Sequence, residues 1–350
     1  MPATEFVELV LSNLAAETDS SVLLTVLRQL SAAVGSFVPA EHRAPMSARV
    51  GDRLRELAAQ APPGSDHQLQ LVTFAAAHAD SPGTAQWARD LLDGITSLDG
   101  LTVDTDLRWS LVTGLAAAGF IDAGAIETEL NRDRTASGQL RARRARSALP
   151  TREAKHCAWE EIRGGELPNA AHEATIAGFG TVTDPQVLAE FVRPYFDSLK
   201  DIWQERTYEM AEQFVVGMYP RQLAGEDLLQ LTDSWLAEHQ DASPALLRLV
   251  TEGRDTARRA AGTSGSDTTA PYLPAQRPTS PHSAIGSDVR RTGGTRTVTR
   301  PEPGETGSCR CPTRRPHFRN RPPNRERPRW KPACYSPATA CRMPAVSRCA

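Results

Sequence analysis

The chain has 350 residues and a formal net charge of −2, which is the balance of two opposed parts. Residues 1–262 carry 24 basic and 37 acidic residues, a net charge of −13, whereas residues 263–350 carry 16 basic and five acidic residues, a net charge of +11. An acidic first part has no electrostatic attraction for nucleic acid, which argues against that class of partner. The charge pattern therefore predicts two domains, 1–262 and 263–350.

Residues 1–262 read as a succession of amphipathic helices. Apolar residues recur at helical spacing between cap and turn residues, and the pattern contains no convincing strand. About fourteen helices are expected, joined by loops of about two to eight residues. In chain order they cover 3–14, 20–37, 40–60, 67–79, a segment around Trp87, Leu91 and Leu92, then segments opened by Asp104 and Asp122, 136–148, 152–162, 168–177, a segment opened by Asp184-Pro185, one longer helix from Trp203 to Met218, 225–238 and 243–260.

The stretch 104–162 shows these signals most clearly. Asp104 and Asp122 occupy N-cap positions, Gly119 ends a helix, and Thr151 provides half of a capping box. Cys157 shares its helix with Ala154, Ala158 and Ile162 and is expected to be a small buried side chain.

Helix pairs of this kind cannot bury both of their faces alone, so neighbouring pairs must stack. The pairs average about 35–45 residues, the range of HEAT or tetratricopeptide arrays, without a clean sequence period. The predicted fold is all-α, an irregular α-superhelix of HEAT-like helix pairs.

The cellular location follows from what the first domain lacks. Residues 1–14 have no basic region typical of a signal peptide, and no apolar run reaches the roughly 20 residues that a membrane span needs. Only one of the six cysteines lies in residues 1–262, so no disulfide framework is indicated there. We expect a soluble cytoplasmic protein without a membrane partner.

Residues 263–350 differ in composition from the rest. They hold 14 of the 26 prolines and five of the six cysteines, while Leu, Ile and Val are scarce. Such a segment cannot build a core and is expected to be disordered. Its Arg, Pro, Thr, Ala and Cys content is typical of a frame-shifted extension of a GC-rich gene. A basic arm that binds phosphates, with Phe318 and Trp330 stacking on bases, is the alternative.

No catalytic constellation is recognisable in residues 1–262. His172-Glu173 begins like the zinc motif H-E-x-x-H, but Ile176 stands where the second histidine ligand would be. No phosphate-binding glycine loop and no nucleophile elbow is present, and Gly164-Gly165 and Gly178-Phe179-Gly180 are interpreted as helix ends. The sequence predicts no metal ligand and no cofactor-binding residue.

Four arginines on one predicted helix form the most conspicuous charged feature: Arg141, Arg143, Arg144 and Arg146. They are interpreted either as a solvated helix face or as a patch that lines a groove. A groove patch would meet a carboxylate or an acidic partner, because the arginine fork suits carboxylates.

Four phrases in the first domain carry a family resemblance: LVLSNLAAETDSSVL, DLRWSLVTGLAAAG, ARSALPTREAKHCAW and RTYEMAEQFVVGMYP. Together they resemble the C-terminal helical domain of actinobacterial aminopeptidase N, a domain also found in endoplasmic-reticulum aminopeptidases. The resemblance covers about residues 2–262 and none of the tail. These are scaffold phrases, so they place no catalytic residue on this chain.

The resemblance implies a role within a zinc gluzincin aminopeptidase. In that family the zinc motif H-E-x-x-H and the G-A-M-E-N loop lie in a separate upstream domain, and neither occurs here. The helical domain closes over the catalytic domain and encloses the peptide substrate. The resemblance therefore implies an N-terminally truncated lid domain without zinc of its own, inactive alone, whose partners are the catalytic domain or a peptide.

Two other functions remain open. The first is a free-standing helical-repeat scaffold that binds peptides or proteins on its concave face. The second is a nucleic-acid binder acting through the +11 tail, with steeply salt-dependent affinity that is lost when residues 263–350 are deleted.

Overall fold

The structure, a computed structural model, describes residues 1–267 and the side chains of residues 1–262. Within this range every regular element is a helix, which confirms the all-α prediction. The last helix continues to Asp267, so the expected boundary at residue 262 falls inside it. The expectations of disorder and of phosphate binding for residues 263–350 concern residues 268–350 almost entirely, and these lie outside the described residues.

The described residues contain fourteen α-helices and four short helical segments of other types. The α-helices are α1 Ala3–Asn13, α2 Ser20–Ala32, α3 Ala40–Gln60, α4 Asp66–Ala77, α5 Pro82–Leu92, α6 Thr105–Ala117, α7 Ala123–Arg132, α8 Ala136–Ala148, α9 Arg152–Gly164, α10 Asn169–Phe179, α11 Val192–Glu205, α12 Tyr208–Gly217, α13 Glu226–Glu238 and α14 Pro244–Asp267. The short segments are η1 Leu14–Ala16, η2 Ala33–Phe37, η3 Pro185–Phe191 and η4 Arg221–Leu223; η2 is π-helical and the others are 3-10 helices.

The predicted caps form as expected. The carboxylates of Asp104 and Asp122 accept from the backbone N–H groups of Leu107 and Ala125, and the Thr151 hydroxyl accepts from Ala154. Gly119 adopts a positive φ of 76° where α6 ends. These contacts satisfy N–H groups that a helix terminus leaves free, and they depend only on neighbouring residues.

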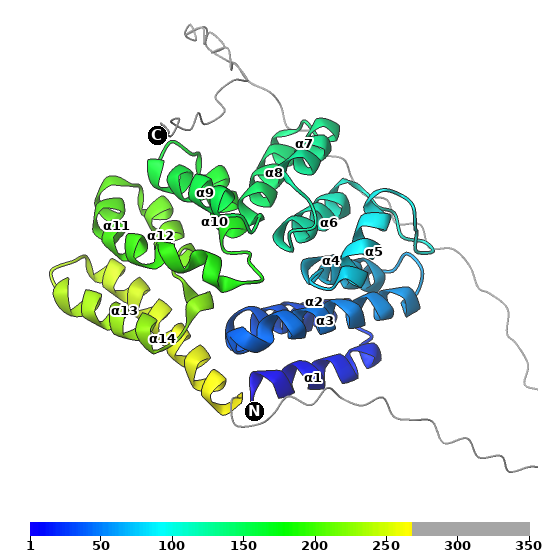
Figure 1. The fold of residues 1–350 in the computed structure, drawn as a ribbon, viewed down its shortest axis with the longest axis horizontal. Helices are drawn as coiled ribbons and strands as arrows, with labels where there is room; N and C mark the ends of the chain where they lie inside the picture. Colours follow the sequence, from blue (N-terminus) through cyan, green and yellow to red (C-terminus); the bar gives the residue numbers. More distant parts are fainter. Residues whose placement is uncertain (268–350) are drawn as a thin grey trace, which may run out of the picture. The chain divides into compact units, whose positions relative to one another are not determined.

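The helices form two layers that follow a curved path from α1 to α14 (Figure 1). The even-numbered helices from α4 to α14 contact one another in succession and make the inner layer. The odd-numbered helices α5, α7, α9, α11 and α13 pack on their even-numbered neighbours from outside. This is the stacked superhelix that the sequence predicts, while a regular HEAT-type repeat stays a prediction.

Small residues bring the inner helices close together. Every residue that α8 buries is small: Gly138, Ala142, Ala145, Ser147 and Ala148. A Cβ placed on Gly178 of α10 would lie 2.1 Å from the carbonyl oxygen of Arg144 on α8. Helix spacing depends on the side chains at the contact, so these small residues let α8 and α10 pack closely.

The expected helix ends form at both glycine-containing segments. α10 ends within Gly178-Phe179-Gly180, with Phe179 as its last residue and Gly180 as its C-cap, and Gly178 in its last turn also serves as the contact with α8. Gly165 ends α9 with a positive φ of 72°.

The longer helix expected from Trp203 to Met218 is divided in two. The chain leaves helical geometry at Arg206, whose ψ is 162°, and α12 begins after Thr207. The Thr207 hydroxyl accepts from the N–H of Met210 and caps the new helix. The apolar spacing continues across this break, which is why periodicity did not reveal it.

The prediction that Cys157 is buried is wrong. Its side chain is exposed, because α9 turns Lys155, Ala158, Trp159 and Ile162 toward the core. These positions follow the i, i+3, i+4, i+7 spacing of one helix face, and Cys157 lies on the opposite side. Because Lys155 is part of this buried face, the face does not look apolar in the sequence.

The end of the described unit returns to its beginning: α14 contacts α1 and η2, and η4 contacts η2 (Figure 1). Two side-chain contacts join distant parts of the sequence. Arg43 Nη1 donates to the Gln222 carbonyl at 3.0 Å, and Thr183 Oγ1 donates to Asp80 Oδ1 at 2.6 Å. The described helices therefore form a closed ring of contacts.

One stretch of the described chain, Ser20–Phe37, is long and apolar enough to cross a membrane by length and composition alone. From the sequence, no apolar run of sufficient length for a membrane span was expected. Leu23, Leu27, Leu30 and Val34 of this stretch belong to the apolar core of the first helices.

Candidate functional site: a groove on the inner layer

A groove of about 810 Å³ lies on the inner side of the helix array. Its walls come from the ends of α2 and α4, from η2 and η4, and from parts of α3, α6, α10 and α12. Side chains far apart in sequence therefore meet there. The apolar lining includes Val34, Ile176 and Val216, so the groove offers apolar and charged surface together.

Charged groups of both signs line the groove. Glu173 belongs to α10, Glu209 and Glu212 belong to α12, and Asp80 follows α4. Arg43 on α3 and Arg221 in η4 are the two arginines of the lining. A lining with both signs of charge suits a ligand that carries both charges.

His78, at the C-terminal end of α4, is held inside the groove wall by two serines. Its Nε2 lies 2.8 Å from Ser31 Oγ and its Nδ1 lies 2.7 Å from Ser47 Oγ. Burial lowers the pKa of His78 to about 4, while the nearby Asp80 raises it. The imidazole is therefore neutral near pH 7, and it ties α2, α3 and α4 together.

The four predicted arginines divide between two faces of α8. Arg141 and Arg144 line a second hollow of about 350 Å³. This hollow shares Ala77, Gly114, Ala117 and Thr181 with the groove. Arg141 also pairs with Asp106 at 2.7 Å, and Arg144 is exposed.

The other two arginines pair with acidic residues of neighbouring helices. Arg143 forms an ion pair with Glu161 of α9, and Arg146 forms one with Glu127 of α7. The structure therefore brings only Arg141 and Arg144 beside the groove. Whether they contact a ligand stays a prediction.

The incomplete zinc motif does not fit zinc in three dimensions. His172 is 3% exposed, and its Nδ1 lies 2.8 Å from Gln213 Oε1. Ile176, one turn later, belongs to the hydrophobic core cluster that also contains Trp159 and Phe214. Burial also lowers the pKa of His172, partly opposed by the hydrogen bond to Gln213. Zinc would lack the second nitrogen ligand that the motif needs.

Among the residues that the structure describes, no group of three or more His, Cys, Asp or Glu side chains is placed to hold a metal ion.

The chain is similar to a known domain family and to a named aminopeptidase. Residues 1–259 match the family described as the ERAP1-like C-terminal domain. The chain belongs to this family. It is also 39% identical over 267 residues to a protein named Aminopeptidase N from Streptomyces lividans. That match covers 76% of this chain and 31% of the relative, so the chain spans about a third of the relative's length.

Family membership confirms the resemblance seen in the sequence. It connects the chain with aminopeptidases as a C-terminal domain, the part that the scaffold phrases indicated. The matched residues end close to the expected boundary at 262, and the match includes every helix that lines the groove.

Sequence reasoning missed Arg43, His78 and Asp80 as groove residues. Each sits in a helix or at its end, without a motif around it. Contacts between residues far apart in sequence bring them together, and spacing within one helix does not report such contacts. The one local signal was that Arg43 lies at helical spacing before Met46 and Val50, at the start of the buried face of α3.

Proposed function

We propose that the chain forms the non-catalytic wall and lid of the substrate chamber of a zinc metallo-aminopeptidase. The match of residues 1–259 to the ERAP1-like C-terminal domain family carries this proposal. The zinc site and the peptide-cleaving residues belong to a separate catalytic part. The chain contributes no zinc ligand and is inactive alone.

The groove supports this role in its size and composition. Ligand-binding clefts measure roughly 300–1,000 Å³ and combine apolar lining with a few polar groups. The groove, at about 810 Å³, lies within this range and has Val216 and Ile176 beside its charged groups. A peptide has apolar side chains, a free ammonium group and carboxylates, so it matches this lining. Arg141 and Arg144 would extend the contact surface into the adjoining hollow.

A reconstitution experiment tests the proposal. The purified chain is assayed with zinc and an aminoacyl chromogenic substrate, alone and then mixed with the separately produced catalytic part of Streptomyces aminopeptidase N. We expect no turnover by the chain alone. We expect the mixture to cleave peptides at least several-fold faster than the catalytic part by itself.

The control replaces the chain with an unrelated acidic helical protein at the same concentration, which should not raise the rate. Turnover by the chain alone that a chelator abolishes would contradict the proposal. Such a result would require a zinc site in this chain.

A free-standing peptide-binding scaffold is the second candidate. One observation favours it: the groove is built from this chain's own helices, and η4 and α14 return to η2 and α1. The scaffold would bind peptides without any catalytic part. No gain of rate on mixing, together with peptide binding by the chain alone, would select this function.

A further inference from the structure

The imidazole of His78 lies between two serine hydroxyls at the wall of the groove. Ser31 of α2 places its Oγ 2.8 Å from Nε2, and Ser47 of α3 places its Oγ 2.7 Å from Nδ1. All three residues line the groove. His78 and Ser47 are buried, whereas Ser31 is half-buried. Ser31 therefore offers the most accessible hydroxyl of the three to a molecule in the groove.

These two hydroxyls differ from an ordinary helical hydroxyl. A serine or threonine inside a helix commonly bonds to the carbonyl four positions earlier, as Thr25 of α2 does with Ser21. Ser31 and Ser47 also lie inside helices, but their hydroxyls lie at hydrogen-bond distance from an imidazole. The pairing with His78 gives them a partner that can accept a proton.

The neutral imidazole has one N–H donor and one nitrogen that accepts. In the tautomer whose Nδ1–H donates to the Ser47 hydroxyl, Nε2 accepts the proton of the Ser31 hydroxyl. Burial keeps the ring neutral, because it lowers the pKa of His78 to about 4 against the opposing effect of Asp80. A nucleophile, a base within hydrogen-bond reach and a third group that orients the base form the arrangement that activates a serine.

We propose that Ser31 is an acylation site, with His78 as its base and Ser47 as the positioning residue of that base. The ligand class is an activated acyl ester whose acyl group lies in the groove, where Val34 provides apolar surface. This inference is independent of the proposed function, because the modification consumes one acyl donor per chain and cleaves no peptide.

The reaction is an acyl transfer. The Ser31 Oγ attacks the carbonyl carbon of the ester and forms a new C–O bond, and the bond from that carbon to the leaving oxygen breaks. The hydroxyl proton passes to His78 Nε2 and from there to the departing alkoxide or phenoxide. The imidazole is thereby returned to its neutral form, and the products are acylated Ser31 and a free alcohol or phenol.

Acetylation of the full chain by 4-nitrophenyl acetate tests the site. The chain is treated at neutral pH and digested, and the acetylated positions are followed over time by mass spectrometry. Ser36 of η2 also lines the groove and is the internal reference. Assistance by a general base contributes roughly 10²–10⁴-fold, so Ser31 should be acetylated about a hundredfold faster than Ser36.

Variants assign the roles. His78→Gln should remove the rate advantage of Ser31 over Ser36, and Ser31→Ala should remove the label at this position alone. Ser47→Ala should reduce the advantage several-fold, because Nδ1 loses the acceptor that fixes the tautomer, and Ser47→Thr should restore it. Ser36→Ala is the matched control and should leave the rate at Ser31 unchanged. Circular dichroism checks that each variant is folded.

The pH dependence of the unaltered chain provides a measurement that needs no variant. The rate at Ser31 should be the same at pH 6 and pH 8, because His78 stays neutral throughout this range. An unassisted hydroxyl reacts through its alkoxide, so its rate rises about tenfold with each pH unit.

Three results would overturn the proposal: acetylation of Ser31 no faster than that of Ser36, equal rates at Ser31 in the unaltered chain and in folded His78→Gln, or a tenfold rise at Ser31 with each pH unit. The aminopeptidase role stands or falls separately, by the reconstitution experiment.

Discussion

Lys155 shows how one residue can join three helices. It belongs to α9, is fully buried, and its Nζ donates to Ser147 O of α8 at 2.7 Å and to Phe179 O of α10 at 3.0 Å. The ammonium also lies 5.6 Å from the centre of the Phe179 ring. It therefore caps the carboxyl ends of α8 and α10, where the helix dipoles favour a cation.

The pH dependence of stability should reveal this lysine. Burial lowers the pKa of Lys155 from 10.5 to about 7 in the folded chain. Between these pH values the unfolded chain binds more protons, so the free energy of unfolding rises as the pH increases. Relative to Lys155→Met, the unaltered chain should gain on the order of 2 kcal/mol between pH 7 and 9, measured by urea unfolding.

Lys200→Met provides the control for this prediction. Lys200 lies near the surface, 3.4 Å from Asp241, and its replacement should leave the slope between pH 7 and 9 in place. An identical slope in Lys155→Met would show that Lys155 is not the source. The carbonyl contacts would then be holding the ammonium in its charged form throughout this range.

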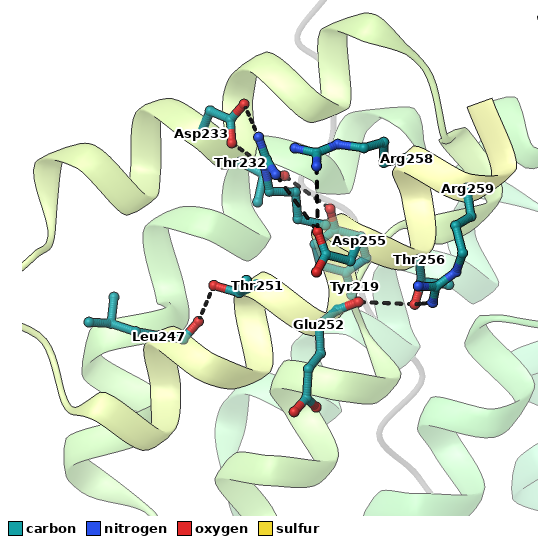
Figure 2. A network of polar contacts seen from close by, with 11 residues as sticks. Tyr219, Thr232, Asp233, Leu247, Thr251, Glu252, Asp255, Thr256, Arg258 and Arg259 are labelled. Carbon is teal, nitrogen blue, oxygen red and sulfur yellow. Dashed lines mark hydrogen bonds and ion pairs between the residues drawn. The ribbon is translucent and has the colours of Figure 1, made fainter. Parts of the chain in front are cut away.

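At the scale of elements, a polar network joins α13 and α14 (Figure 2). Arg254 on α14 pairs with Asp233 on α13, and the hydroxyls of Tyr219 and Thr232 lie 3.0 Å apart. The Tyr219 ring also covers Gly253, where an added Cβ would lie 2.8 Å from a ring carbon. Tyr219, which lies between α12 and η4, thus contacts both α13 and α14.

Two glycine substitutions in α14 should therefore have opposite effects. Gly253→Ala should lower the free energy of unfolding by about 1–3 kcal/mol, because the new methyl group clashes with the Tyr219 ring. Gly262→Ala has no atom within 4 Å of its Cβ and should raise stability by up to about 1 kcal/mol through helix propensity. Thermal unfolding of both variants measures the difference; equal stabilisation would mean that Tyr219 does not rest on Gly253 in solution.

At the scale of the whole described unit, the groove exists because distant segments meet. Asp80 and Thr183 are 103 positions apart, yet their side chains are joined by a 2.6 Å hydrogen bond beside the groove. Arg43 and Gln222, 179 positions apart, make the second such contact. These contacts join the segment after α4 to the segment after α10, and α3 to η4.

A double-mutant cycle should detect this closure. Asp80→Ala and Thr183→Val should each destabilise the chain, and their effects should couple by about 1–2 kcal/mol in urea unfolding. Thr181→Val is the matched control, because the Thr181 hydroxyl donates to Ala177 within its own segment. Asp80→Ala and Thr181→Val should be additive. Additive effects of Asp80→Ala and Thr183→Val would show that the contact does not hold in solution.

Local sequence was sufficient for the helices and the family. Asp104, Asp122 and Thr151 cap helices through contacts with residues three positions away, so each cap is readable from its neighbours. The stacking of helix pairs followed from apolar stripes that no single pair can cover. The scaffold phrases then indicated the family that residues 1–259 match.

Only the tertiary structure decided which face of a helix is inside and which side chains share the groove. Lys155 is buried and Cys157 is exposed, because backbone carbonyls of α8 and α10 accept hydrogen bonds from the ammonium of Lys155. The sequence of α9 alone does not indicate that these carbonyls lie there. Arg43 is held beside the groove by its hydrogen bond to the Gln222 carbonyl of η4, which is far away in the sequence. The sequence by itself determined the helices and their order, because caps and periodicity act over a few residues. The groove required the folded chain, because its charges come from helices that only packing brings together.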